Sequence, residues 1–120
     1  MSWELLNDRP IYTQLVEQIE QRIITGEYKP GSKMPSVREL AAEAAVNPNT
    51  MQRAMGELES RGLIMTNRTA GRVVTEDESI LIQIRENRAK DFTKEYLVKM
   101  SELKYDRDEI IEFIRKGENE

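Results

Sequence analysis

A short polar segment in the middle of the chain holds the side chains best suited to bind another molecule. Between residues 47 and 72 there are four arginines and only two glutamates, although the whole chain has a net charge of −4. Gln52 and Arg53 carry hydrogen-bond donors that can read adenine or guanine edges in a major groove. A positively charged segment in an acidic protein is typical of a surface that faces phosphates. This segment is the first candidate for contact with nucleic acid, and simple solvation of both side chains is the alternative.

A helix is expected to present these two side chains. Asn47 can cap its start and Pro48 suits the first helical position, so the pattern predicts a helix that reaches Arg61 and ends at Gly62. Its inner face comprises four apolar residues at helical spacing, Met51, Ala54, Met55 and Leu58. Residues 49, 52 and 53 then share the outward face.

A shorter helix precedes this one and turns sharply against it. Ser36 and Glu39 have the spacing of a capping box, which starts a helix that extends to Ala44. Few residues separate Ala44 from Asn47, so the two helices are expected to form a helix-turn-helix. A first amphipathic helix lies upstream, between residues 10 and 26, with an apolar stripe at i+4 spacing, Ile11, Leu15, Ile19 and Ile23.

Two short segments rich in β-branched residues follow the helix pair. Leu63–Thr66 and Arg72–Thr75 are the predicted strands, with a polar tip between them. They predict a hairpin directly after the helix-turn-helix. The order of helix, helix-turn-helix and hairpin predicts a winged helix-turn-helix, so the fold class is mainly α with a small β-hairpin.

The C-terminal part of the chain has a helical pattern and carries the whole net negative charge. Residues 77–103 repeat apolar side chains every three or four positions. Asp106 and Glu109 have the spacing of a capping box, and Tyr105 and Ile110 have that of a hydrophobic staple. They predict a last helix that begins here and ends before Gly117. Two helices are too few to bury all their apolar side chains alone. We expect them to pack on the winged domain, on a second chain, or on both.

One stretch of the sequence resembles a known family. Residues 27–41 read EYKPGSKMPSVRELA, and VNPNT follows at 46–50. They resemble the DNA-binding domain of GntR-type bacterial transcription regulators, in the right order over roughly residues 10–75. The remaining residues resemble the two-helix extension of the short YtrA-like subfamily, whose members dimerise through it. The resemblance therefore implies a DNA-binding domain at 1–75 and a C-terminal dimerisation extension at 76–120.

The resemblance also implies which residues contact DNA. Arg38 occupies a phosphate- or base-contacting position, and Gly71 falls at the tip of the wing. Thr69 and Val73 stand where the family commonly has a glycine and an aromatic residue, which leaves open whether this wing enters the minor groove. The expected DNA-binding residues are Ser36, Arg38, Asn47, Asn49, Thr50, Gln52, Arg53, Arg68, Gly71 and Arg72.

Several of these residues have a purely structural alternative. The alternatives are capping for Ser36, Asn49 and Thr50, pairing with Glu39 or another acidic neighbour for Arg38, and protection of the hairpin edge for Arg68 and Arg72.

The apolar stripe of the C-terminal helices is expected to form a dimer interface. A ligand cage is the alternative for its aromatic residues, but such stripes are far more often core or dimer contacts. The expected interface residues are Ile84, Phe92, Tyr96, Met100, Leu103, Ile110, Phe113 and Ile114.

Composition excludes several other functions. The chain has no cysteine and no histidine, which excludes disulfides and thiolate metal sites and removes the commonest general base. The acidic groups at 76–78 and 106–109 lie where helices begin, so capping explains them. We expect no enzyme activity, no metal and no cofactor. No apolar run is long enough for a membrane span, and residues 1–4 lack the features of a signal peptide, which favours a cytoplasmic bacterial protein.

These patterns together predict a homodimeric, sequence-specific transcription regulator. Repression from an inverted-repeat operator is the expected mode, with double-stranded DNA as partner and a small-molecule effector as a further possible one. A winged-helix module that binds another protein, without direct contact to DNA, is the alternative function.

Overall fold

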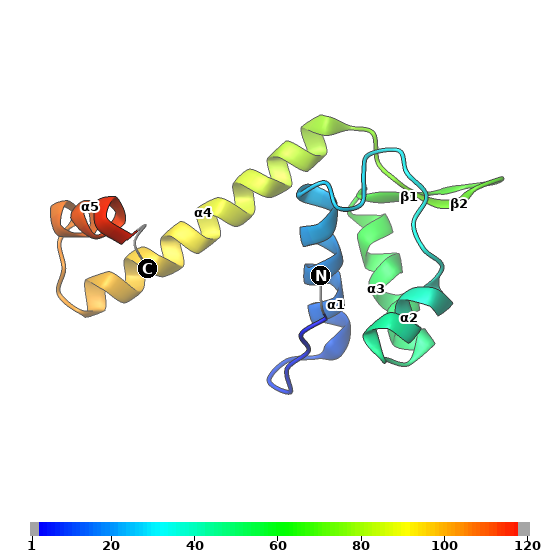
Figure 1. The fold of residues 1–120 in the computed structure, drawn as a ribbon, viewed down its shortest axis with the longest axis horizontal. Helices are drawn as coiled ribbons and strands as arrows, with labels where there is room; N and C mark the ends of the chain where they lie inside the picture. Colours follow the sequence, from blue (N-terminus) through cyan, green and yellow to red (C-terminus); the bar gives the residue numbers. More distant parts are fainter. Residues whose placement is uncertain (1–2, 118–120) are drawn as a thin grey trace. The chain divides into compact units, whose positions relative to one another are not determined.

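The computed structural model describes residues 3–117 and divides into two compact units after Ile84 (Figure 1). Met1 and Ser2, part of the segment considered for a signal peptide, lie outside the described residues. The elements are α1 (Ile11–Ile24), α2 (Val37–Ala44), α3 (Pro48–Ser60), β1 (Ile64–Asn67), β2 (Gly71–Val74), α4 (Glu78–Glu102) and α5 (Arg107–Lys116). The boundary between the units falls inside α4. The mainly helical class with a small antiparallel hairpin is confirmed.

The core of the first unit forms where α1 and α3 lie side by side (Figure 1). Leu15, Ile19 and Ile23 of α1 are buried, as the i+4 stripe predicted. The four predicted inner residues of α3, Met51, Ala54, Met55 and Leu58, are fully buried as well. Burial of a large apolar side chain such as leucine, isoleucine or methionine contributes about 1.5–3 kcal/mol. The packing therefore fixes the polar side of α3 toward the surface.

A reciprocal cap begins α2. Ser36 Oγ accepts a hydrogen bond from the Glu39 N–H at 3.1 Å, and Glu39 Oε1 accepts one from the Ser36 N–H at 3.0 Å. These hydrogen bonds from Ser36, the backbone one first, lower the pKa of Glu39. The helix ends at Ala45, which has a left-handed backbone with φ of 57°. The chain thereby reverses between α2 and α3 within a few residues, and the predicted helix-turn-helix is confirmed.

The hairpin pairs β1 with β2 from Ile64 opposite Val74 to Asn67 opposite Gly71. Each strand is displaced by one residue from its prediction. The reason at the first strand is that the Leu63 N–H donates to the Leu58 carbonyl, so this residue completes the end of α3. At the tip, Gly71 has φ of 81° and still pairs with the opposite strand.

A third extended segment lies along the other edge of β2, and the sequence pattern did not predict it. The N–H groups of Gly31 and Met34 donate to the carbonyls of Val74 and Arg72, at 2.9 and 2.8 Å. Lys33 forms an isolated bridge with Val73. The segment before α2 is thus fixed to the hairpin, which positions Lys33 and Ser36 near the wing.

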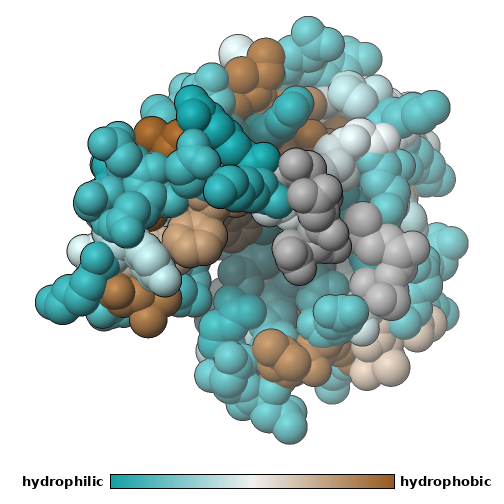
Figure 2. Space-filling view, turned by 60° about the vertical axis from the view of Figure 1, so that its left-hand side comes forward, coloured by the Kyte–Doolittle hydropathy of each residue, from teal (hydrophilic) through white to brown (hydrophobic). Residues whose placement is uncertain are grey.

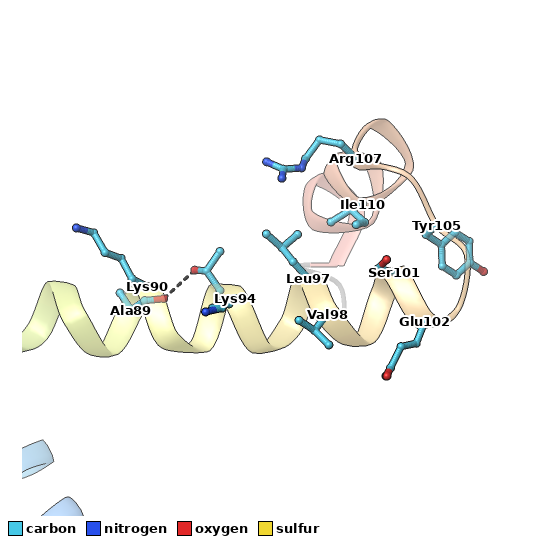
Figure 3. Close-up of a pocket in the computed structure, with 11 residues that line it drawn as sticks. Ala89, Lys90, Lys94, Leu97, Val98, Ser101, Glu102, Tyr105, Arg107 and Ile110 are labelled. Carbon is cyan, nitrogen blue, oxygen red and sulfur yellow. Dashed lines mark hydrogen bonds between the residues drawn. The ribbon is translucent and has the colours of Figure 1, made fainter.

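The second unit comprises the rest of α4 together with α5. The capping box of Asp106 and Glu109 is confirmed, and the Tyr105 ring packs edge-on against Phe113 with centroids 5.0 Å apart. Figure 3 shows Leu97 pointing from α4 toward α5, near Ile110. A cleft of about 830 Å³ lies between these helices. No helix within residues 3–117 is long and apolar enough to cross a membrane.

The residues expected at a dimer interface differ widely in exposure. Leu103 is 66% exposed and Phe92 59%, and Figure 2 shows hydrophobic side chains standing at the surface among hydrophilic ones. Ile110 is only 4% exposed, so its own chain already buries it. Ile84 belongs to the first unit and packs against its core. Of the residues expected at the dimer interface, only the exposed ones, such as Phe92 and Leu103, offer apolar surface that a second chain can cover.

Candidate nucleic-acid interface

The outer face of α3 carries the polar side chains singled out from the sequence. Asn49, Gln52 and Arg53 are exposed, opposite the buried inner face, and Thr50 is half-buried. Asn47 is the N-cap, and its Oδ1 accepts a hydrogen bond from the Asn49 N–H at 2.7 Å. The cap thus fixes the first turn of α3, from which Asn49 and Gln52 are exposed to solvent.

Arg53 is held in a defined direction. Its guanidinium carbon lies 3.6 Å from the centroid of the Tyr12 ring, which belongs to α1. A cation over an aromatic face at this distance is attracted by the ring quadrupole. The Arg53 side chain forms no ion pair with any residue that the structure describes. Its charge is therefore ordered and still available to an anion from outside.

Arg38 is also available. It is exposed in the first turn of α2, where the helix dipole disfavours a cation. The expected alternative was pairing with Glu39 or another acidic neighbour, but the Glu39 carboxylate binds the Ser36 backbone. Arg38 has no ion pair within the described part of the chain. The pairing alternative is thus wrong for this residue, and an external phosphate remains a suitable partner.

Arg72 differs from the other arginines of the expected site because Glu59 already binds it. Its Nε lies 3.1 Å from Glu59 Oε1, while Thr66 Oγ1 donates to Glu59 Oε2 at 2.8 Å. The hydrogen bonds from Thr66 and Arg72 lower the pKa of Glu59. One carboxylate on α3 thereby ties both strands of the hairpin to the helix. Sequence reasoning missed this role of Glu59, although an acidic residue in a basic segment was a signal for it.

The tip of the hairpin is ordered by a side chain rather than by a second glycine. Asn67 Oδ1 accepts hydrogen bonds from the N–H groups of Thr69 and Ala70, at 2.9 and 3.1 Å, and from the Thr69 hydroxyl at 2.9 Å. Thr69, which departs from the family pattern, thus takes part in the turn. Arg68 beside it is exposed and unpaired among residues 3–117.

A cleft of about 490 Å³ separates the hairpin tip from the segment before α2. Ser36 and Lys33 line one side, and Thr69 and Gly71 line the other. Lys33 is exposed and makes no ion pair with a described residue. It was not among the expected DNA-binding residues, because the pattern gave no sign that residues 31–34 run beside the hairpin.

The cations of the first unit thus fall into two groups. Arg61 lies 3.3 Å from both Glu20 and Glu57, and Arg72 is paired with Glu59. Among residues 3–84, the cations without an ion pair are Lys29, Lys33, Arg38, Arg53 and Arg68. Pairing inside the chain therefore removes two of the four arginines in segment 47–72 from the candidate interface.

Three helices with a helix-turn-helix and a following hairpin define a winged helix-turn-helix protein. The model of the family described as bacterial regulatory proteins, gntR family, matches residues 11–74. This is more than half of the chain, and the chain belongs to the gntR family.

Known relatives agree with this assignment over nearly the whole chain. YhcF, an HTH-type transcriptional regulator of Bacillus subtilis, is 34% identical over 115 residues, which cover 96% of this chain and 95% of YhcF. The structure of a GntR family transcriptional regulator from Listeria monocytogenes has a TM-score of 0.87 and 40% identity, and covers 93% of this chain and 98% of that one.

A second solved structure contains DNA. The AraR DNA-binding domain, solved in complex with operator ORE1, has a TM-score of 0.53 and 30% identity. The match covers 62% of this chain and 94% of that one. One structure similar to this chain is therefore a DNA-binding domain bound to its operator.

Proposed function

We propose that this chain is a sequence-specific DNA-binding transcription regulator that places the outer face of α3 in a major groove. The observation that carries the proposal is the set of exposed polar side chains on that face, flanked by the unpaired cations Arg38 and Arg53. Base edges suit Asn49 and Gln52, and phosphates suit the cations. The AraR–operator structure supports the same use of the fold.

The proposed DNA contacts differ in kind. Ser36, Asn47 and Thr50 lie at helix starts, where hydroxyl, amide and backbone N–H groups suit phosphates. Arg68 and Gly71 at the wing tip are proposed to lie along the DNA backbone. Arg72 is the exception among the expected residues, because its pairing with Glu59 gives it a role in positioning the wing.

The second unit is proposed to form a homodimer. Exposed apolar side chains such as Phe92, Leu103 and Phe113 would be covered by a second copy. A two-fold dimer implies an inverted-repeat operator with half-sites about one helical turn apart. Repression follows sterically, because a dimer on its operator excludes other proteins from that DNA. In this proposal the winged domain comprises residues 1–75 and the dimerisation extension comprises 76–120.

A small-molecule effector, where one acts, is proposed to bind in the cleft between α4 and α5. Leu97 and Ile110 give this cleft an apolar floor, and Lys90 and Arg107 add positive charge to its lining (Figure 3). This combination suits an organic anion with an apolar part.

The test is selection of bound duplexes from a random DNA pool at moderate salt. Enrichment of an inverted repeat is expected, and the Gln52→Ala variant should enrich a sequence relaxed at one position of each half-site. Failure of the wild-type protein to enrich any sequence would overturn the proposal in favour of a module that binds protein.

A further inference from the structure

Two neighbouring residues of α3 are oriented in different ways, although both were expected to read bases. Gln52 is exposed, and no side chain of another element holds it among the described contacts. Arg53 lies over the Tyr12 ring of α1 with its guanidinium carbon 3.6 Å from the ring centroid. Successive residues of a helix point about 100° apart, so these two side chains leave α3 in different directions.

The stack on Tyr12 determines what Arg53 can contact. A guanidinium that lies over a ring has one face covered, while its N–H groups project from its edge. The stack also draws the group toward α1 and away from the middle of the outer face of α3. An edge of N–H donors at the margin of the helix suits a phosphate oxygen, which accepts hydrogen bonds whatever the base sequence.

We propose that Tyr12 belongs to the DNA interface as a positioning residue, holding Arg53 so that it contacts a backbone phosphate and leaving Gln52 to read the base. This inference rests on the proposed function and assigns distinct tasks within the same site. A glutamine amide can bond the N6 and N7 atoms of adenine together, which suits Gln52 to that base.

A second arginine stack in the same unit provides a matched control. The guanidinium carbon of Arg22 also lies 3.6 Å from a ring centroid, that of Trp3. Arg22 is only 2% exposed, and its Nε lies 3.3 Å from Glu27. The two stacks share their geometry but differ in exposure, so only the Arg53 stack has a cation that DNA can reach.

The first measurement compares the affinity of full-length variants for the selected operator and for its single-base-pair substitutions, over a range of salt concentrations. Arg53→Ala should weaken binding about tenfold or more on every sequence, as expected for loss of a charge-assisted hydrogen bond. The slope of log K against log salt should become smaller by about 1.8, because each of the two protomers of the proposed dimer loses one phosphate contact worth about 0.9. Gln52→Ala should keep the slope and lose discrimination at one base pair.

The second measurement tests Tyr12 directly. Tyr12→Phe keeps an aromatic ring and should bind like wild type, whereas Tyr12→Leu should weaken binding on every sequence. In the Arg53→Ala background, Tyr12→Leu should cause no further loss, because the two residues act through one contact. Trp3→Leu should leave the salt slope unchanged, and thermal unfolding checks that each variant is folded.

Two results would overturn the inference while leaving the proposed function intact. One is an Arg53→Ala variant that keeps the salt slope and loses discrimination at a particular base pair, since Arg53 would then read a base. The other is a folded Tyr12→Leu variant with wild-type affinity. Failure of the wild-type protein to bind any duplex specifically would instead overturn the proposed function itself.

Discussion

The two units of this chain bury their apolar side chains to very different degrees. The first unit contains a continuous core drawn from α1, α2, α3 and the hairpin, with Leu15, Leu40 and Leu58 fully buried. In the second unit Ile110 is the buried hydrophobic residue among those described, and α4 has no buried residue at all. Hydrophobic burial is the dominant favourable contribution to folding. The first unit is thus stabilised by a core of its own, whereas the second unit leaves apolar side chains exposed that another molecule can cover.

The largest expected effect is a cavity in the core of the first unit. Leu58→Ala should lower the free energy of unfolding by about 2–5 kcal/mol, because Leu58 is fully buried between packed helices. Leu103→Ala is the matched control, since Leu103 is 66% exposed, and should change the stability of the monomer very little. Urea unfolding at low protein concentration measures both. Equal losses in the two variants would break the comparison between the units.

The next effect concerns self-association through the second unit. Phe113 is 47% exposed. If a second copy covers its side chain, Phe113→Ala should weaken the dimer by about 1.5–3 kcal/mol, because each of the two protomers loses about half of the value of burying a large apolar side chain. Sedimentation equilibrium measures the dimer dissociation constant, and circular dichroism checks the helices. An unchanged dissociation constant would remove Phe113 from the interface.

Both units contain a helix that begins with a capping box. Removing each cap in turn shows whether the two units unfold together or separately. Ser36→Ala should lower the free energy of global unfolding by about 1 kcal/mol, since the cap begins a helix of the packed core. Asp106→Ala removes the corresponding cap of α5 and should act locally. Amide hydrogen exchange should show faster exchange in α5 alone for this variant. Faster exchange throughout the first unit would show that the units unfold together.

The smallest effect involves Glu59, whose carboxylate connects the hairpin to α3. Its folded-state pKa lies below the usual 4.5, so its stabilising effect is present above that value and is lost as the pH falls through the folded-state pKa. Glu59→Gln should reduce stability by about 0.5–1 kcal/mol at neutral pH. The difference between wild type and variant should shrink as the pH falls from 4.5 through the lower folded-state pKa. A difference that grows on acidification would contradict this sign.

The helices of both units could be predicted from sequence because their signals are local. The caps at Ser36, Asn47 and Asp106 act within three residues, and the apolar stripe of α1 repeats within one helix. Both predicted strands were displaced by one residue. At the first strand the reason is that the Leu63 N–H donates to the Leu58 carbonyl at the end of α3, a contact that strand propensity does not predict.

The arrangement of the candidate site was less predictable, because it depends on contacts between distant parts of the chain. Arg53 meets Tyr12 across the interface of α1 and α3, and Arg72 meets Glu59 thirteen positions away. The extended segment that carries Lys33 is ordered by β2, which follows it by some forty residues. Residue types identified the candidates for DNA contact. Only tertiary packing separates the paired arginines from the unpaired ones.

In the proposed complex the first unit contacts operator DNA and the second unit does not. Amide chemical-shift mapping of the full chain, titrated with the duplex enriched by selection, distinguishes the two units. We expect the largest perturbations at residues 36–38, 47–53 and 67–71, with small ones in α5. Perturbations concentrated in residues 85–117, with α3 unaffected, would show that the first unit is not the DNA-binding surface.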